Sequence, residues 1–419
     1  MNKEQITEIV KKENVKFIKL MFVDIDGKPK VIEVASTSLP SILDNKILVD
    51  GSSITGLSTI DRSDLILAPD LSSFRRLSIY DAPIGNVAMF MCDILTVKEE
   101  AMPGCTRTNL RNQLDKMKKL GFDKMNVGFE PEFFLFSKPP VGKIDESFFC
   151  DTAGYTDSEE TDTRAHVRRE IMHELGKIGI QCITSHHEVS PSQHEISYLF
   201  ADALTACDNL VLFRIIVTEV ARKHGLYASF MPKPVEGING NGLHTHISLE
   251  KGSANAFAGN GDLADTAKHF ITGILTHARP LCMLTNPDPN SYRRLVPCFE
   301  APTNICWGYA NRSAMIRIPN ASGKATRIEV RNPDSCSNPY LAVSGLLAAG
   351  LDGIAKKLPI IANVDFNVFV EKTKQIASLC GCLDESIAEF ERSEVIRAAL
   401  TDHIATILVK EKSKLTDVR

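Results

Sequence analysis

The 419-residue chain has no dense block of basic residues: its 48 lysines and arginines are balanced by 52 aspartates and glutamates. The two signs are interspersed along the sequence, and the formal net charge is −4. Chains that bind nucleic acid usually gather Lys and Arg on one face or along one helix. We therefore expect no nucleic-acid partner.

Long apolar runs are also missing. The first residues, MNKEQITEIVKKENVKF, are charged and lack the continuous apolar stretch of a signal peptide. The most apolar later stretch, residues 340–355, is interrupted by Gly345, Gly350 and Asp352. It is typical of a buried helix rather than a membrane span. We expect a cytoplasmic chain with no membrane partner.

Two further absences exclude classes of site. The eleven cysteines are scattered with no CxxC pair, which argues against a structural zinc site and is typical of a reducing compartment. Gly323-Lys324 is followed by alanine and lacks the upstream spacing of a Walker A loop. The HRD and DFG motifs of protein kinases are also absent.

The composition that is present, 43% hydrophobic residues, is enough for a large core and more than one domain. Residues 15–34 contain two strand-like runs joined by DIDG, a hairpin signal, and NVAMFMCDIL is a third strand. Beyond residue 100, helical and strand patterns alternate, and residues 357–419 have weak helical signals. We predict an α+β protein with a small strand-rich domain (1–100) and a larger mixed domain (101–419).

Several predicted strands carry polar residues two positions apart, which places them on one strand face. The first pair, Glu130 and Glu132, lies within the apolar strand GFEPEFFLF; the others are His244 with His246 and Glu329 with Arg331. In HHEVSPSQHEI, Glu188 and Glu195 flank a turn. If these strands are neighbours, their shared face is an oxygen-rich site for two or more Mg²⁺ or Mn²⁺ ions. Solvated strand faces or ion pairs with arginine are the alternative.

A basic cluster follows between residues 290 and 331: Arg293, Arg294, Arg312, Arg317, Lys324, Arg327 and Arg331. Guanidinium groups match the oxygens of phosphate and carboxylate. Together with a metal–carboxylate site they favour phosphoryl transfer. A surface salt-bridge network is the alternative, and it suits Arg293 better than Arg317. We expect the NGNGLH stretch before the 243–249 strand to bring backbone close to a small ligand.

These motifs, in this order, resemble the type I glutamine synthetases of bacteria and archaea. The resemblance covers roughly residues 15–360 and includes DGSSI, SDLILAPD, EPEFFLF, HHEVSPSQHEI, FMPKPVEGINGNGLHTHISL, TNPDPNSYRRLVPCFEAP, NRSAMIRIP, RIEVR and NPYLA. It implies an N-terminal β-grasp domain and a catalytic domain with a curved antiparallel sheet flanked by helices. The implied reaction joins ammonia to the γ-carboxylate of glutamate through γ-glutamyl phosphate, with ATP as co-substrate.

The resemblance also implies a role for each matching position. One metal ion would be held by Glu132, Glu188 and Glu195, and the other by Glu130, His244 and Glu329. Glutamate would contact Asn239, Gly240, His244, Arg294 and Arg331. The nucleotide would contact Phe200, His246, Ser248, Arg317, Lys324 and Arg327. Asp50 and Ser53 would form the ammonium pocket, reached from a neighbouring subunit, while Arg312 would stabilise the transferring phosphate and Glu300 would close a flap against water.

Departures from the family pattern leave alternatives open. Cys298 stands where glycine is usual in the flap, and Ile183 where many members have glutamate near the nucleotide. A γ-glutamyl ligase that uses an amine or polyamine, or a non-catalytic regulatory member, would share most of these motifs. Asp50, Ser53, Asp64 and Glu300 favour ammonia, and the complete set of metal ligands argues against a non-catalytic member. We expect a homo-oligomer, a hexameric ring or a dodecamer.

Overall fold

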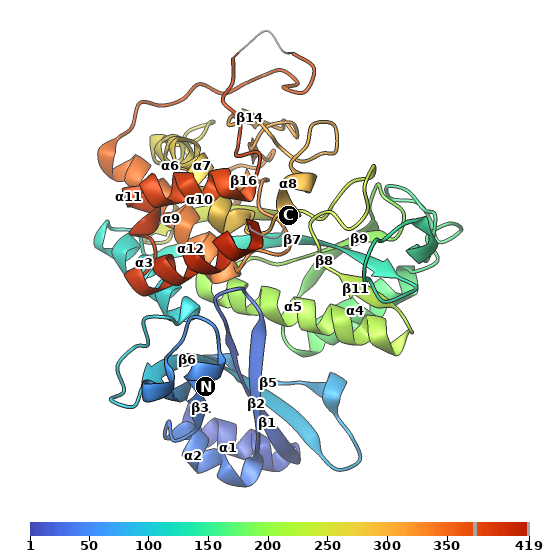
Figure 1. Cartoon of the computed structure of the whole chain (residues 1–419), viewed down its shortest axis with the longest axis vertical. Coiled ribbons are helices and arrows are strands. Elements are labelled where there is room, and N and C mark those ends of the chain that lie inside the picture. The colour runs from blue at the N-terminus through green and yellow to red at the C-terminus, as the bar shows by residue number, and fades with distance from the viewer. Residues whose placement is uncertain (372–374, 417–419) are drawn as a thin grey trace.

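A six-stranded sheet lies at one end of the molecule, drawn in blue at the bottom of Figure 1, in a computed structural model that describes residues 1–371 and 375–416. The strand order is β2-β1-β6-β4-β3, with β5 paired to β6. The strands are β1 (Val15–Val23), β2 (Pro29–Ala35), β3 (Leu48–Asp50), β4 (Asp64–Pro69), β5 (Arg75–Arg76) and β6 (Asn86–Thr96). The hairpin predicted around DIDG is present as β1 and β2, and helices α1 (Lys3–Lys12) and α2 (Leu39–Leu43) share the apolar core of this sheet.

A ten-stranded sheet forms the centre of the larger part of the chain. Its main order is β14-β15-β16-β12-β7-β9-β8, with β10 and β11 on β7 and β13 on β12. The pairs are antiparallel except for β14 with β15. The strands are β7 (Lys124–Phe136), β8 (Cys182–His187), β9 (Gln193–Tyr198), β10 (Ala201–Asp202), β11 (Tyr227–Ser229), β12 (Leu243–Lys251), β13 (Ala254–Asn255), β14 (Trp307–Tyr309), β15 (Ile316–Ile318) and β16 (Ile328–Val330).

Helices cover the apolar face of this sheet. The helix α5 packs against β7, and α9 packs against α3, α5, α6 and α7. The helices are α3 (Thr106–Lys119), α4 (Ala165–Lys177), α5 (Ala203–Lys223), α6 (Asp265–Thr276), α7 (Ala278–Thr285), α8 (Ser291–Arg294), α9 (Pro339–Lys356), α10 (Leu383–Arg392), α11 (Glu394–Arg397) and α12 (Asp402–Thr416). The predicted buried helix over 340–355 is confirmed as α9, and none of the described helices has the length and apolarity to span a membrane.

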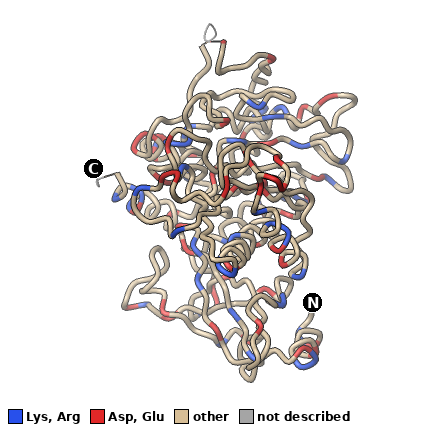
Figure 2. Tube along the Cα trace, turned by 90° about the vertical axis from the view of Figure 1, so that its right-hand side faces the viewer, with Lys and Arg blue, Asp and Glu red and all other residues tan. Residues whose placement is uncertain are grey.

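The prediction that residues 357–419 are helical is wrong for the described part of 357–382, which is irregular. This segment instead donates backbone hydrogen bonds to 303–307 and accepts one from it, for example from Leu379 N to Thr303 O at 2.9 Å and from Val364 N to Trp307 O at 2.8 Å. Tertiary pairing of this kind overrides a weak helical propensity. Acidic and basic positions are spread over the whole trace in Figure 2, as the sequence indicates.

The strand β7 explains how a buried sheet carries charged residues. Its odd-numbered residues, such as Val127, Phe129 and Phe133, lie in the apolar core shared with α5. The even-numbered residues face the other way, and Glu130 and Glu132 among them line a pocket. Because the side-chain period of a strand is two, the apolar face anchors the strand while the opposite face carries the polar groups.

A buried arginine joins the two parts of the chain. Arg107, on α3, is 3% exposed and contacts three carboxylates. Its guanidinium lies 2.8 Å from Asp208 on α5, 2.7 Å from Asp70, directly after β4, and 3.0 Å from Asp93 on β6. We expect Arg107→Met to destabilise the protein by about 3–5 kcal/mol, because three carboxylates would lose a buried counter-charge.

Thermal and urea unfolding would measure this loss. Arg169→Met is the matched control, since Arg169 forms an ion pair with Glu159 but is 58% exposed on its side chain. Exposed pairs contribute little, so the control should unfold close to the parent. Equal midpoints for the Arg107 and Arg169 variants would contradict a joining role for the buried network.

Candidate active site

Neighbouring strands bring the predicted polar pairs onto one face of the large sheet. In the strand register Glu132 lies opposite Glu195, Glu130 opposite His244, and His246 opposite Glu329. Opposed residues on adjacent strands lie close together, with Cβ atoms about 4.5–5.5 Å apart. The sequence-predicted cluster is therefore a continuous row across β9, β7, β12 and β16.

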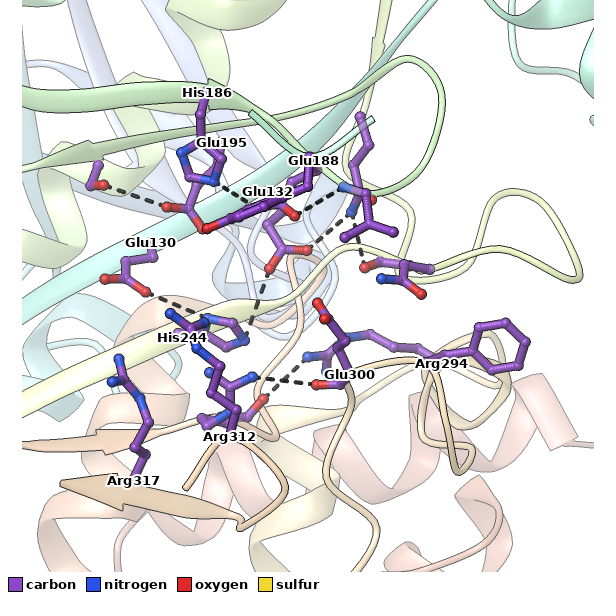
Figure 3. A pocket seen from close by; sticks show the side chains of 18 of the residues that line it. Glu130, Glu132, His186, Glu188, Glu195, His244, Arg294, Glu300, Arg312 and Arg317 are labelled. Carbon is purple, nitrogen blue, oxygen red and sulfur yellow. Dashed lines mark hydrogen bonds and ion pairs between the residues drawn. The ribbon is translucent and has the colours of Figure 1, made fainter. Parts of the chain in front are cut away.

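This row forms one wall of a pocket of about 510 Å³, which we call the carboxylate pocket. Figure 3 shows the glutamates on one side, Arg312 and Arg317 on the other, and His244 between them. Most predicted metal and glutamate positions line this pocket: Glu130, Glu132, Glu188, Glu195, Asn239, Gly240, His244, Arg294 and Arg331. Glu329 lies behind them, fully buried, and Glu300, from the loop after α8, also lines the pocket.

The carboxylates of the row differ in charge preference. Burial and the neighbouring Glu188 raise the pKa of Glu132 to about 8, and burial with four other glutamates, Glu130 first, raises the pKa of Glu195 well above its usual value. Burial also opposes ionisation of Glu130, but hydrogen bonds from His244 and His246 hold its pKa well below the usual range. A site with more negative charge than its protein partners neutralise is a site for a cation.

The donor set fits divalent metal ions. Among the described residues, four groups have ligand atoms within 4.8 Å of one another, and three of them lie in this row: Glu130, Glu195 and His244; Glu130, His246 and Glu329; and His186, Glu188 and Glu195. The fourth, Asp151, His187 and His194, is fully buried beside β9. Carboxylate oxygens with a single imidazole suit Mg²⁺ or Mn²⁺. Burial lowers the pKa of His244 and so favours the neutral imidazole that coordinates metals.

The composition of these groups differs from the predicted ligand sets. His186, for which no ligand role is predicted, and His246, predicted to contact the nucleotide, lie within the groups, and Glu132 does not. Glu132 instead accepts hydrogen bonds from the backbone N–H of Gly242 (2.8 Å) and from Gln193 Nε2 (3.0 Å). The assignment of each carboxylate to one of the two metal ions therefore stays a prediction.

Buried arginines shape the opposite part of the pocket. Arg294 is 3% exposed and donates to the carbonyl oxygens of Arg331, Asn332 and Pro333. Arg331 donates to Glu329 Oε1 at 2.7 Å, and its buried Nε–H has no partner among the described residues. Two rigidly held guanidinium groups therefore line the pocket, with a donor available for an acidic ligand.

The glycine-rich stretch lies where backbone must come close to charged groups. A Cβ at Gly242 would lie 2.8 Å from Arg294 Nη2 and 3.0 Å from Glu132 Oε1, and one at Gly240 would lie 2.1 Å from the carbonyl oxygen of Pro232. Any side chain at either position would displace these groups. The predicted approach of this backbone to a small ligand stays a prediction.

A second pocket of about 510 Å³ lies beside the first, and both are lined by Glu130 and Ser197. Its lining includes five of the predicted nucleotide-side residues, Phe200, His246, Ser248, Lys324 and Arg327. Arg317, predicted with them, lies in the carboxylate pocket and donates to Glu329 Oε2 at 2.5 Å. The departure Ile183 also lines the second pocket, where it is 56% exposed.

Asp50 and Ser53 are not among the residues that line the carboxylate pocket. Asp50 ends β3 and accepts hydrogen bonds from the backbone N–H of Ser52 at 2.9 Å and from the Ser53 hydroxyl at 2.6 Å. The Ser52 hydroxyl also donates to Asp50 at 2.6 Å, and this bond first, with the other two, holds the pKa of Asp50 below its usual value. Within one chain this carboxylate caps a short turn, the alternative that its sequence allows, and it remains exposed.

Several pocket residues were missed in the sequence: Tyr155, Thr184, His186, Val189, Gln193, Ser197 and Phe299. Gln193 is the most buried of the polar ones, at 1%, and its Nε2 lies within hydrogen-bond distance of Glu132, the carbonyl oxygen of Gly240 and Asn241. It precedes Glu195 by two residues on β9, so the strand period already placed it on the same face.

The raised pKa of Glu132 leads to a test of metal binding. A carboxyl whose folded pKa, about 8, exceeds its ordinary value of 4.5 stabilises the fold below pH 4.5, and this contribution is lost as the pH rises to about 8. We expect metal-free protein to lose stability over this range, and Mn²⁺ to raise the unfolding midpoint more at pH 8 than at pH 6. In Glu132→Gln the difference between the two pH values should shrink; an unchanged difference would contradict the assignment.

Comparison with known proteins identifies the family. Residues 103–417 match the family model described as glutamine synthetase, catalytic domain, and residues 14–97 match that of the glutamine synthetase beta-grasp domain. The chain belongs to the glutamine synthetase family. The predicted family, and the predicted β-grasp fold beside a catalytic sheet flanked by helices, are confirmed.

Individual relatives agree. Glutamine synthetase of Thermus thermophilus is 43% identical over 420 residues, which cover 98% of this chain and 94% of that protein. A glutamine synthetase of Staphylococcus aureus strain Mu50 is 42% identical over 419 residues, with the same coverage. Members of this family are ATP-dependent ligases that act on glutamate and use divalent metal ions, and the chain is an enzyme of this kind.

Two solved structures have the same fold. A structure titled as a complex of GmaS with ADP has a TM-score of 0.89 and 29% identity, and covers 98% of this chain and 95% of that chain. The glutamine synthetase of Plasmodium falciparum has a TM-score of 0.89 and 26% identity, and covers 100% of this chain and 96% of that chain.

Proposed function

We propose that the enzyme joins ammonia to the γ-carboxylate of glutamate through γ-glutamyl phosphate, giving glutamine, ADP and phosphate. The observation that supports this most is the adjacency of the two pockets, which share Glu130 and Ser197. An acidic substrate among Arg294, Arg331 and the glycine loop would lie next to a nucleotide against Phe200. Phosphoryl transfer depends mainly on such positioning and on charge neutralisation.

Each group of side chains has a distinct task in this reaction. Bound divalent ions, held by the glutamate row and His244, would neutralise phosphate charge. Arg294 and Arg331 orient the substrate carboxylates, and Arg312 stabilises the charge on the transferring phosphoryl group. Glu300 closes the loop over the acyl phosphate and limits its hydrolysis. Asp50 and Ser53, exposed on the N-terminal part, receive ammonium in the site of an adjacent subunit of a hexamer or dodecamer in the cytoplasm.

A second candidate is ligation of a larger amine to glutamate. The observation that favours it is Cys298, which stands in the closing loop where glycine is usual and has a positive φ of 72°. The glutamate, metal and nucleotide positions are the same for both candidates. The acceptor alone distinguishes them.

A phosphate-release assay with ATP, Mg²⁺ and glutamate would decide between them when run separately with ammonium, methylamine, ethanolamine and putrescine. We expect kcat/KM to be highest for ammonium, with glutamine as the product by mass spectrometry. If phosphate is released only with a larger amine, that amine and not ammonia is the acceptor. If no acceptor supports phosphate release, in protein that binds ATP, both candidates are contradicted.

A further inference from the structure

Lys233 is a buried lysine beside the pocket to which no role has been assigned so far. It follows β11 and is 5% exposed. Its Nζ donates to the carbonyl oxygen of Ile238, which directly precedes the NGNGLH stretch, the glycine loop. Its backbone N–H donates to Asn290 Oδ1 at 2.7 Å, and Asn290 Nδ2 donates back to the Lys233 carbonyl at 2.9 Å. Lysine is rarely this buried unless its charge has partners.

The ammonium group of Lys233 lies 4.0 Å from the centroid of the Phe299 ring. Phe299 directly precedes Glu300 in the loop that we propose closes the site. A cation over an aromatic face is attracted to it, most strongly where water is excluded. The lysine stem also passes Gly240, where a Cβ would lie 3.2 Å from its Cδ. One side chain thus contacts both the closing loop and the glycine loop.

The backbone of the closing loop requires such an anchor. Cys298 and Glu300, on either side of Phe299, have positive φ angles of 72° and 57°. Left-handed conformations are unfavourable for residues with a Cβ and persist where surrounding contacts hold them. At its two ends the loop is held by Val296 N–H, which donates to the Arg294 carbonyl at 2.7 Å, and by Arg331 Nη2, which donates to the Glu300 carbonyl at 3.4 Å. The Lys233–Phe299 contact secures the centre of a strained turn.

We propose that Lys233 is a positioning residue whose contact with Phe299 latches the loop of residues 296–301 over the pocket. The proposal rests on the proposed function, because a latched Glu300 matters only if a water-sensitive acyl phosphate forms beneath it. Loss of the latch then leaves phosphoryl transfer in place but lets water compete with the amine. The latch sets the ratio of phosphate released to amide formed.

A double-mutant cycle tests the latch. Lys233→Met keeps the apolar stem beside Gly240 and removes the charge, and Phe299→Leu removes the ring. We expect each variant to raise the ratio of phosphate to amide about fivefold, and the double variant to raise it no further than the larger single effect. Phe299→Tyr keeps the ring and should restore the parental ratio. Lys138→Met is the matched control, since Lys138 lies 5.5 Å from the Phe148 ring outside the pocket lining.

Amide hydrogen exchange across residues 296–301 provides a readout that needs no chemistry. Exchange should accelerate in Lys233→Met and Phe299→Leu and stay at the parental rate in Lys138→Met. Unchanged exchange, additive effects in the double variant, or faster exchange with a parental product ratio would each overturn the latch. If the parent forms no amide with any acceptor, the proposed function fails, and the exchange rates alone decide whether the latch exists.

Discussion

Replacing Arg312 with alanine is expected to lower the rate of phosphate release by about 10³-fold or more while leaving the fold intact. A phosphoryl group in transfer spreads negative charge over three oxygens, and one positioned arginine contributes at least this factor in related chemistry. Arg312 lies in the loop that joins β14 to β15, lines the carboxylate pocket and is exposed. Its removal therefore leaves no buried charge without a partner.

Single-turnover phosphate release with saturating ATP and glutamate would measure this effect separately from product release. Arg293→Ala is the matched control: it lies in the same basic cluster, forms an ion pair with Glu236 at 3.5 Å, and does not line the pocket. Both variants should have the same unfolding midpoint as the parent protein. Release by the Arg312 variant within about tenfold of the control would remove it from the phosphoryl-transfer step.

Replacing Asp50 with alanine is expected to lower kcat/KM for ammonium about 10²-fold and to spare formation of the acyl phosphate. The hydrogen bonds from Ser52 and Ser53 lower the pKa of Asp50, so the carboxylate is ionised at neutral pH and can take a proton from ammonium. Acyl phosphate can be trapped with hydroxylamine as the hydroxamate. Wild-type ammonium use by this variant would refute the assignment.

Mixing subunits tests where Asp50 acts. If one subunit supplies Asp50 and its neighbour supplies Arg312, co-assembled Asp50→Ala and Arg312→Ala chains contain intact sites that neither variant has alone. Random assembly of equal amounts restores about a quarter of the parental activity, since each site draws its two residues from different chains. As a control, Arg312→Ala chains mixed with Arg312→Met chains should stay inactive, because every site then lacks this arginine. Activity no higher than the mean of the separate variants would place both residues in one chain.

The strand period made much of the carboxylate pocket predictable. Alternation in GFEPEFFLF already places Glu130 and Glu132 on one face, and the structure extends that face to Glu195 and His244. Which strands are neighbours depends on contacts far apart in the sequence, so the order β16-β12-β7-β9 could be stated only as a condition. The missed Gln193 needed no such knowledge, because it lies two residues before Glu195.

Burial of charge was the feature that sequence reasoning could not supply. Nothing in the helical pattern around Arg107 distinguishes it from the half-exposed Arg111 one turn later, although both contact Asp70. Lys233 likewise has no sequence signal of its contact with Phe299. Whether such groups are buried depends on how α3, α5 and the two sheets pack, which is decided by the whole chain.

The order of the strands across the large sheet has a consequence for synthesis on the ribosome. The glutamates of β7 and β9 emerge in the first half of the chain, whereas Glu329 and Arg331, which pair with each other at 2.7 Å, emerge after about three quarters of it. Until then β12 lacks its partner β16, and the pocket lacks Arg331. A chain that stops before β16 therefore cannot complete the pocket, whatever its earlier strands have formed.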